Sequence, residues 1–279
     1  MTVLHRPAPP SHRGRTPSRP GNGTAQVQSL TRGLSILECL ARSEGGLTLT
    51  DIAHRVELPA STTHRLLGTL EKTGFVYQMG DLGRWYVGLS AFTVGSSFLA
   101  NRDFATHSHA YMRRLMEQCG ETANLAILDG TEAVFIDQVQ CRETMRTIVK
   151  LGSRVPLHAS GVGKAIFASL PDDQIDALLK VKGLPRITEN TITSPETMWA
   201  SIRVIRQRGW SFDDEEHLPG TRCVAAPIYD EHEEPLGAIS LAGPSTRLGD
   251  DRIRQLGPVV SHFAEEITRR LGGRWPHGS

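Results

Sequence analysis

The sequence lacks the features of membrane and secreted proteins. No apolar run among its 279 residues approaches the roughly 18 residues that a membrane-spanning helix needs. The first twenty residues contain four arginines, from Arg6 to Arg19, but no apolar block. We therefore expect no secretory signal and no membrane partner.

Cysteine is scarce as well, with four residues in the chain. They show neither a CxxC pair nor dense spacing, which favours a protein of the reducing cytoplasm over a disulfide-rich one. The four are Cys39, Cys119, Cys141 and Cys223.

The length and the apolar content are sufficient for two ordinary globular domains, with 39% hydrophobic and 22% charged residues. The net charge of +1 hides an asymmetry, because the first hundred residues contain ten Lys/Arg and six Asp/Glu, whereas the remainder contains 21 and 24. A basic N-terminal third is suited to contact with a polyanion.

Residues 1–24 are rich in Pro, Arg, Ser and Gly and have few large apolar side chains. Such a segment cannot offset the entropy of ordering, so we expect a disordered basic tail. It is either a solvated tail or an arm that contacts DNA phosphates.

Residues 25–88 have the pattern of a winged helix-turn-helix domain. Apolar residues recur at helical spacing in the first helix, at Leu30, Leu34, Leu37 and Leu40–Ala41. Thr48 or Thr50 is placed to cap a second helix, and Pro59 separates it from a third. Three helices followed by a hairpin are typical of this fold. The expected elements are helices over 27–43, 50–56 and 61–72 and strands over 75–78 and 85–88.

The third helix is the candidate DNA-reading element. Its apolar stripe is Thr63, Leu66, Leu67 and Leu70, and no acidic residue occurs before Glu71. Short hydroxyls, an arginine and the helix N-terminus suit base edges and phosphates. The predicted contacts on the opposite side are Ser61, Thr62, His64, Arg65 and Thr69.

In the wing, Arg84 is a predicted phosphate contact, whereas Trp85 is expected in the core. A polar surface helix without a partner is the alternative interpretation. The helix spacing, the wing and the charge balance together favour binding to double-stranded DNA.

The remaining chain is expected to contain a linker helix in 89–103, a domain of α+β class over 104–272 and a flexible tail over 273–279. Strands grouped with intervening helices indicate a mostly antiparallel sheet. The expected helices cover 104–119, 162–170, 172–181, 195–208 and 250–271, and the strands 122–129, 133–140, 145–150, 210–213, 222–229 and 236–242.

Five motifs make the chain resemble the IclR family of bacterial transcription regulators over residues 25–272. They are VQSLTRGL (27–34), STTHRLL (61–67), LHASGVGKA (157–165), FDDEEH (212–217) and AISLAGP (238–244). The resemblance implies a GAF/PAS-like effector domain, homodimers that pair into tetramers, and a small 2-oxo acid such as glyoxylate or pyruvate as the signal.

Within the family, FIDQVQC (135–141) and SFDDEEH (211–217) are most similar to members that repress the glyoxylate bypass. The segments NRD (101–103) and PSTRL (244–248) resemble regulators of allantoin use. We therefore expect a repressor that responds to a small carboxylate. Control of an allantoin or aromatic-acid pathway, as repressor or activator, is the alternative.

The SGVG segment (160–163) lies where a loop becomes a helix. Glycines let backbone N–H groups approach a ligand, and a helix N-terminus favours a carboxylate. Lys164 does not complete a phosphate-binding loop, because the upstream glycines are missing and Ala165 occupies the Ser/Thr position. A structural glycine turn is the alternative.

The resemblance implies ligand contacts from the backbone of Gly161 and Val162 and from the side chains of Asp213, Cys223 and Ser240. Each side chain has a structural alternative, as a turn cap, a core residue or a sheet residue. The chain departs from close relatives at Ala242, where a second serine is common, and at Thr144, Thr147 and Thr221, where larger apolar residues are common.

Two other functions use the same residues. His158, Asp213 and Cys223 are residue types that serve as a nucleophile with its base, or as metal ligands. Their spacing gives no compact metal signature, and nothing in the sequence brings them together. We expect no enzyme activity, no cofactor and no metal.

Overall fold

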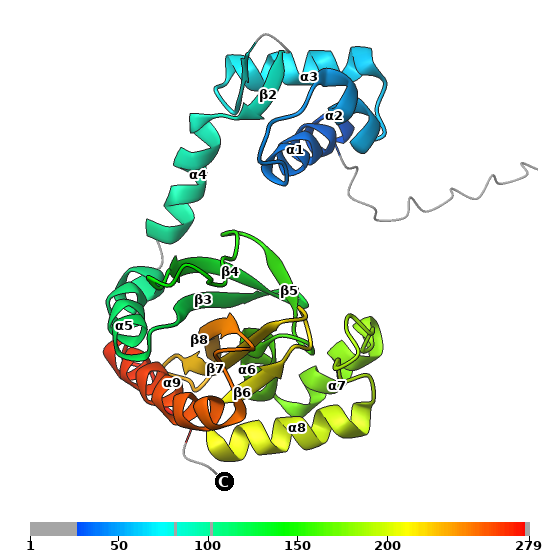
Figure 1. Ribbon diagram of the computed structural model, residues 1–279. Helices are drawn as coiled ribbons and strands as arrows, with labels where there is room; N and C mark the ends of the chain where they lie inside the picture. The colour runs from blue at the N-terminus through cyan, green and yellow to red at the C-terminus, as the bar shows by residue number, and fades with distance from the viewer. Residues whose placement is uncertain (1–26, 81–82, 101–102, 277–279) are drawn as a thin grey trace, which may run out of the picture. The chain divides into compact units, whose positions relative to one another are not determined.

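The computed structural model describes residues 27–80, 83–100 and 103–276 (Figure 1). The chain divides into two compact units, residues 1–94 and 95–279. The predicted basic tail, 1–24, lies outside the described residues. None of the helices in the described part is long and apolar enough to cross a membrane.

The first unit contains three helices and a two-stranded antiparallel wing, so the predicted winged helix-turn-helix is confirmed. Its second helix begins with a capping box, in which Thr48 accepts from the Asp51 backbone while Asp51 accepts from Thr48. The elements are α1 (Gln28–Ala41), α2 (Leu49–Arg55), α3 (Ala60–Lys72), β1 (Val76–Met79) and β2 (Arg84–Val87).

The core of this unit joins the three helices to the wing through Ile36, Ile52, Leu67 and Trp85. Trp85 is 5% exposed, as expected. The predicted stripe on α1 is wrong in part, because Leu30 and Leu34 are 62% and 51% exposed.

Leu40 of the predicted stripe is buried, together with Gly33 and Ile36, whereas Leu30 and Leu34 lie roughly a quarter turn around the helix from these three residues. Leu30 and Leu34 line a hollow of about 830 Å³ between α1 and α3.

A six-stranded sheet organises the second unit, in the order β5-β4-β3-β8-β7-β6 with every pairing antiparallel. This confirms the α+β class and the antiparallel sheet. Helix α4 (Leu89–Ala100) contains the division between the units. The other elements are α5 (Asp103–Cys119), β3 (Thr122–Asp129), β4 (Glu132–Val139), β5 (Arg154–Pro156), α6 (Gly161–Ser169), α7 (Asp172–Lys182), α8 (Pro195–Arg208), β6 (Ser211–Asp214), β7 (Thr221–Tyr229), β8 (Pro235–Pro244) and α9 (Asp250–Arg270).

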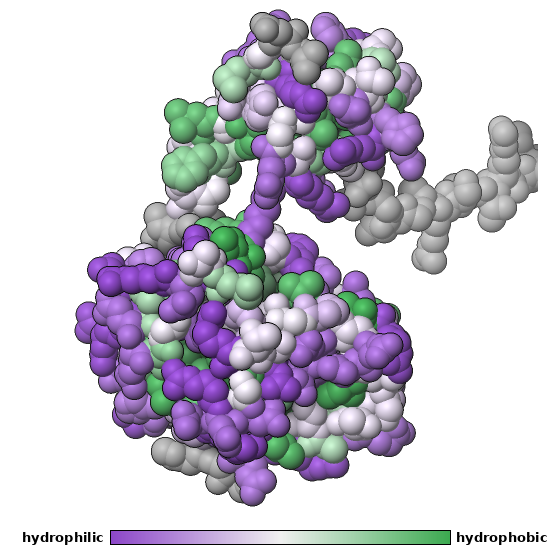
Figure 2. Space-filling model, in the orientation of Figure 1, coloured by the Kyte–Doolittle hydropathy of each residue, from purple (hydrophilic) through white to green (hydrophobic). Residues whose placement is uncertain are grey.

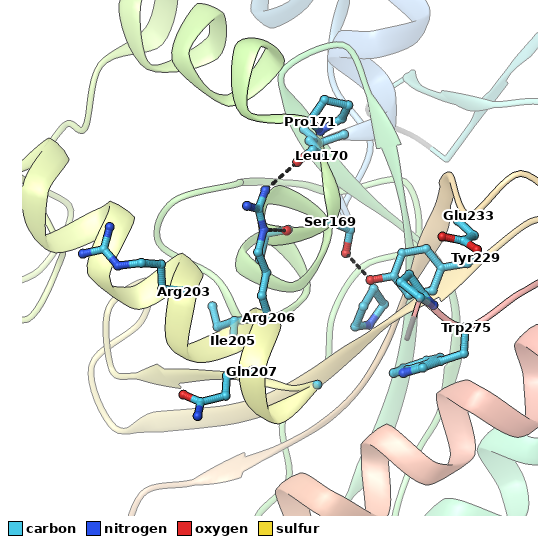
Figure 3. A pocket seen from close by; sticks show the side chains of 14 residues that line it. Ser169, Leu170, Pro171, Arg203, Ile205, Arg206, Gln207, Tyr229, Glu233 and Trp275 are labelled. Carbon is cyan, nitrogen blue, oxygen red and sulfur yellow. Dashed lines mark hydrogen bonds between the residues drawn. The ribbon is translucent and has the colours of Figure 1, made fainter. Parts of the chain in front are cut away.

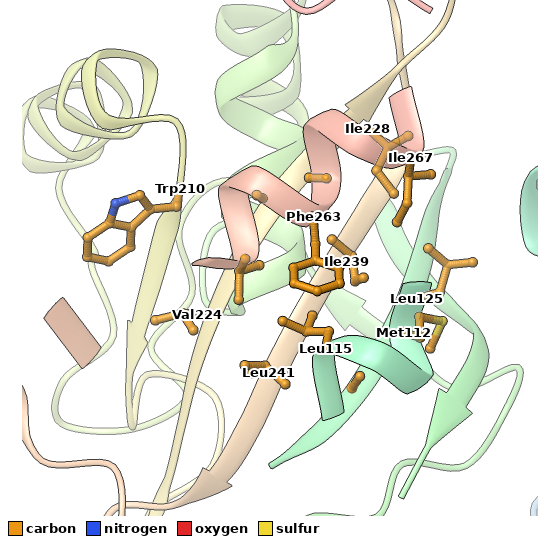
Figure 4. Close-up of a cluster of buried hydrophobic side chains, with 14 of the residues drawn as sticks. Met112, Leu115, Leu125, Trp210, Val224, Ile228, Ile239, Leu241, Phe263 and Ile267 are labelled. Carbon is orange, nitrogen blue, oxygen red and sulfur yellow. The ribbon is translucent and has the colours of Figure 1, made fainter. Parts of the chain in front are cut away.

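Alternate residues of the strands face two different layers of helices. Leu125, Val224 and Ile239 pack against α5 and α9 (Figure 4). Their neighbours Ala225 and Ala238 pack in the second cluster, with α6 and α8. Because alanine is small, α6 lies close to the sheet, and this proximity positions the N-terminus of α6 over β6, β7 and β8.

The strand predicted over 145–150 is wrong. No strand is assigned to this segment, and Met145 and Ile148 are 68% and 60% exposed. The ladder on β4 is made instead by β5, which pairs with residues 132–134. The apolar residues of 145–150 alternate with the spacing of a strand, but no sheet face is available to bury their side chains.

Part of the segment expected to be a flexible tail is held on the second unit. The Gly273 and Arg274 backbones donate to Thr268 and Asp230 carbonyls at 2.8 and 2.9 Å. The Trp275 ring meets Tyr229 edge to face at 5.4 Å. A large ring that covers the end of β7 accounts for the difference from the expectation.

Candidate DNA-binding helix and effector site

The polar side of α3 is accessible in the structure. Ser61, His64, Arg65 and Thr69 are exposed and Thr62 is half-buried. Thr63 and Leu67 are buried, and Leu66 and Leu70 pack against the core. The helix therefore has the orientation that base or phosphate contacts require.

The start of α3 is also suited to a phosphate. Pro59 occupies the N-cap and gives no side-chain hydrogen bond, and the first turn has no acidic residue. The first-turn N–H groups and the helix dipole therefore favour an anion. Lys72, which the sequence reasoning missed, is exposed and lies two turns from Arg65 on the same side.

Arg84 differs from the other predicted DNA contacts. Its Nη1 donates to the carbonyls of Gly46 at 3.0 Å and Gly45 at 3.4 Å. The Tyr86 hydroxyl donates to Gly45 as well, at 3.2 Å. Arg84 thus fastens the wing to the turn between α1 and α2, and a phosphate contact would use its remaining N–H groups.

In the second unit, the five predicted effector contacts come together at the N-terminus of α6. Asp213 and Cys223 are partners across β6 and β7. A Cβ added to Gly161 would lie 2.5 Å from Cys223 Sγ. The Val162 backbone and the Ser240 side chain both lie close enough to the Cys223 thiol to oppose the rise in its pKa that burial causes. Three strands, β6, β7 and β8, therefore bring residues far apart in the sequence to the start of α6.

The two glycines of the SGVG segment have different roles. At Gly163 a Cβ would lie 2.6 Å from the Pro156 carbonyl oxygen, so Gly163 is required by packing alone. Ser160 caps the helix, because it accepts from the Gly163 backbone at 3.1 Å and donates to Pro156 at 2.9 Å. Gly161 faces the side chains of the candidate site instead.

The structure adds a buried ion pair that the sequence reasoning missed. Lys164 Nζ contacts Glu216 Oε1, and the two side chains are 3% and 7% exposed. The Glu216 backbone donates to Asp213 Oδ1 at 2.8 Å. Lys164 is therefore paired with a carboxylate of the protein itself. This pairing argues against a phosphate-binding loop at this segment.

Burial sets the protonation of the site. It raises the pKa of Asp213 to about 7, although the Lys164 cation and the Glu216 backbone N–H oppose the shift. It raises the pKa of Cys223 to about 12, with the Asp213 charge acting in the same direction. Burial and then His158 lower the pKa of His217. Cys223 is thus a neutral thiol at physiological pH and not an activated nucleophile.

Three buried polar atoms in this region have no hydrogen-bond partner among the described residues. They are Ser240 Oγ, Glu216 Oε2 and His217 Nδ1. The Ser240 hydroxyl influences the Cys223 thiol but makes no hydrogen bond to a described residue. Because buried polar groups are normally paired, these atoms indicate a site for a polar ligand.

A different hollow, of about 930 Å³, lies at the opposite end of α6 (Figure 3). Arg206 lines it, but its three nitrogens donate to the Ala168 and Leu170 carbonyls and to Asp172 at 2.8 Å each. The C-terminal end of a helix also disfavours anions. This hollow is therefore a poorer carboxylate site than the start of α6.

The enzyme and metal interpretations gain no support from the geometry. The His158 Nε2 donates to the Pro185 carbonyl at 3.0 Å. Within the described ranges, no three His, Cys, Asp or Glu side chains form a group that could hold a metal ion.

Comparison with known proteins identifies both units. Residues 29–80 match the family model for the IclR helix-turn-helix domain. Residues 96–269 match the model for the bacterial transcriptional regulator IclR C-terminal domain.

The chain is 49% identical to the acetate operon repressor of Salmonella typhimurium, over 95% of this chain and 97% of that protein. It is 41% identical to the HTH-type transcriptional repressor AllR of Klebsiella pneumoniae, over 93% and 96%. Among solved structures, that of Thermotoga maritima IclR has a TM-score of 0.75 at 30% identity and covers 88% of this chain and 100% of that one.

These relatives are named as repressors, and this chain matches the IclR helix-turn-helix model, which confirms that the chain is a DNA-binding transcriptional regulator. The accessible α3 face and the matches along both units lead to one assignment. The chain belongs to the IclR family of DNA-binding transcriptional regulators.

Proposed function

We propose that this protein is a cytoplasmic repressor of an operon for the use of two-carbon acids, and that a small 2-oxo acid controls its affinity for the operator. The 49% identity to an acetate operon repressor over nearly the whole chain supports the pathway. Glyoxylate and pyruvate are the acids that we favour as effectors.

The contact between Gly161 and Cys223 is the observation that carries the effector proposal. It brings the first turn of α6 to within van der Waals distance of the thiol. The effector carboxylate is held by the backbone N–H groups of Gly161 and Val162, and Asp213, Cys223 and Ser240 surround its 2-oxo group. Cys223, Asp213 and Ser240 are 8%, 6% and 0% exposed, so a ligand of two or three carbons fits the site better than a larger one.

The operator is read by Ser61, Thr62, His64, Arg65 and Thr69 of α3, with Arg84 on a flanking phosphate. The polar face of α3 and its uncapped N-terminus support these contacts. Arg65 makes no ion pair with any described residue, and its guanidinium is thus available to a base or a phosphate.

The protein acts as a homodimer, and two dimers form a tetramer. In α4, Leu89, Phe92 and Val94 are 78%, 71% and 62% exposed, and hydrophobic residues gather over the start of this helix (Figure 2). A helix with so much apolar surface is better stabilised against a second copy than in water. Two reading helices per dimer match a palindromic operator.

Effector binding changes operator affinity by a shift between two arrangements of the paired effector units. The acid favours one arrangement because it contacts α6 from one side and β6, β7 and β8 from the other. A changed separation of the reading helices no longer matches the two operator half-sites, so affinity decreases.

Isothermal titration of the purified full chain with glyoxylate and with pyruvate tests the effector. We expect saturable heat with at least one of them, and none with allantoin or 4-hydroxybenzoate. Heat from another small carboxylate, with none from either 2-oxo acid, would overturn the proposed effector while leaving the DNA-binding function intact.

A further inference from the structure

The one cation at the start of α6 is already paired before any effector enters. Lys164 Nζ is in contact with Glu216, and both side chains are almost fully buried. Asp213 is also buried, at 6% exposure, and accepts a hydrogen bond from the Glu216 backbone. One cation therefore faces two carboxyl groups.

An incoming carboxylate changes this balance. Lys164 is already neutralised by Glu216, so the effector would add a second uncompensated negative charge if Asp213 were ionised. Two like charges in a low-dielectric site are strongly disfavoured, and one of them takes up a proton instead.

The other groups around Asp213 leave it as the proton acceptor. Cys223 on β7 stays a neutral thiol, and Ser240 on β8 does not titrate. The neighbouring Asp214 forms an ion pair with Arg222. His217 follows on the same loop, and burial and then the nearby His158 lower its pKa, which favours the neutral imidazole. Lys164 is the charged group that α6 directs at Asp213.

We propose, on the basis of the function proposed above, that the site binds its effector as a monocarboxylate together with one proton from solvent, which resides on Asp213. Glu216 is the residue that sets this selectivity, because it neutralises Lys164 and leaves no free cation for a second acid group. Protonated Asp213 then donates a hydrogen bond to the effector, while its other oxygen keeps the Glu216 backbone bond.

The ordinary chemistry of Asp213 supports this assignment. Its pKa of about 7 in the protein without effector places the group close to half-protonated at neutral pH. A nearby anion raises the pKa further. Proton uptake on binding is therefore small in mild acid and approaches one proton per site above neutrality.

Calorimetric titration with pyruvate tests the inference directly. The full chain is titrated from about pH 6 to about pH 8.5 in two buffers of different ionisation enthalpy, which gives the number of protons taken up. We expect a nearly constant Kd below pH 7 and a Kd that rises about tenfold per pH unit well above it. Malonate, a dianion of similar size, should bind at least about tenfold more weakly than pyruvate.

Two variants at neighbouring positions separate proton coupling from a general loss of structure. Asp213→Asn imitates the protonated side chain and should bind pyruvate with a Kd that no longer depends on pH. Asp214→Asn changes the adjacent, partly exposed carboxylate that pairs with Arg222 and should keep the wild-type pH dependence. Glu216→Gln frees Lys164 and should decrease the preference for pyruvate over malonate.

A pyruvate Kd that is constant over this pH range, with no proton uptake, would overturn the inference while leaving the proposed effector intact. Binding that is equal for malonate and pyruvate would overturn the role of Glu216. If neither pyruvate nor glyoxylate gives heat at any pH, both the proposed effector and this inference are rejected.

Discussion

Gly161 and Cys223 are packed so closely that position 161 has no room for a side chain: a Cβ there would lie 2.5 Å from Sγ and 3.2 Å from Cβ of Cys223. This contact joins the first turn of α6 to the beginning of β7. Any change that separates the two residues alters the site on both sides.

Gly161→Ala should therefore abolish the response to the effector while operator binding remains. The added methyl group forces α6 away from β7, at a cost of about 1–3 kcal/mol in the free energy of unfolding. Gly249→Ala is the matched control, because no atom lies within 4 Å of its added Cβ. Retained pyruvate binding in the Gly161 variant, measured by calorimetry, would contradict the placement of the site.

Arg65→Ala should weaken operator binding by about 1–3 kcal/mol if the guanidinium contacts a base. Because Arg65 is exposed, its removal should leave the thermal midpoint of unfolding almost unchanged. Mobility-shift titration at fixed salt measures the effect, with the exposed Arg270→Ala of the second unit as the control. An unchanged affinity would remove Arg65 from the reading surface.

Cys223 should resist thiol reagents. Its pKa of about 12 keeps the thiol protonated, and the residue is buried. Cys39 is only half-buried and should be alkylated first. Mass spectrometry after a timed iodoacetamide reaction distinguishes the two, and rapid modification of Cys223 would revive the nucleophile interpretation.

Asp213 should make the protein less stable as the pH rises from about 4 to about 7. Its pKa is the ordinary 3.8 in the unfolded chain and about 7 in the fold, so over this interval the unfolded chain loses a proton that the folded chain keeps. The free energy of unfolding falls accordingly, by on the order of 3 kcal/mol, and then levels off.

Urea unfolding at a series of pH values measures this change. Asp213→Asn should match the wild type near the acidic end and exceed it above neutrality, whereas Asp214→Asn should follow the wild type throughout. Equal pH profiles for the wild type and Asp213→Asn would show that Asp213 does not hold its proton in the folded state.

The sequence was sufficient for the elements with clear periodicity. The α3 stripe at Thr63 and Leu67 and the buried Trp85 of the wing follow from spacing and side-chain size. The strand predicted over 145–150 failed because alternation predicts a strand only where a sheet face is available. Leu30 and Leu34 failed because two apolar rows lie on α1, and the packing of the neighbouring helices determines which one is buried.

The candidate site was predictable only in part. The glycine segment at the start of α6 and the family resemblance located Gly161, Val162, Asp213, Cys223 and Ser240, whose roles remain predictions. No spacing rule connects Lys164 with Glu216, which are 52 residues apart and are brought together by the fold. The hydrogen bond from Arg84 to the Gly46 carbonyl could not be predicted from the sequence either, because its acceptor is a backbone atom that every residue has.

The central claim, that an acid at the start of α6 controls the reading of DNA, is tested most directly by fluorescence anisotropy. A labelled duplex, selected by the protein from a random-sequence pool, is titrated with the full chain in the presence and absence of saturating pyruvate or glyoxylate. We expect one of these acids to raise the Kd for the duplex at least about fivefold, and Gly161→Ala to lose that change. Superimposable curves, with acid binding confirmed by calorimetry, would contradict the account.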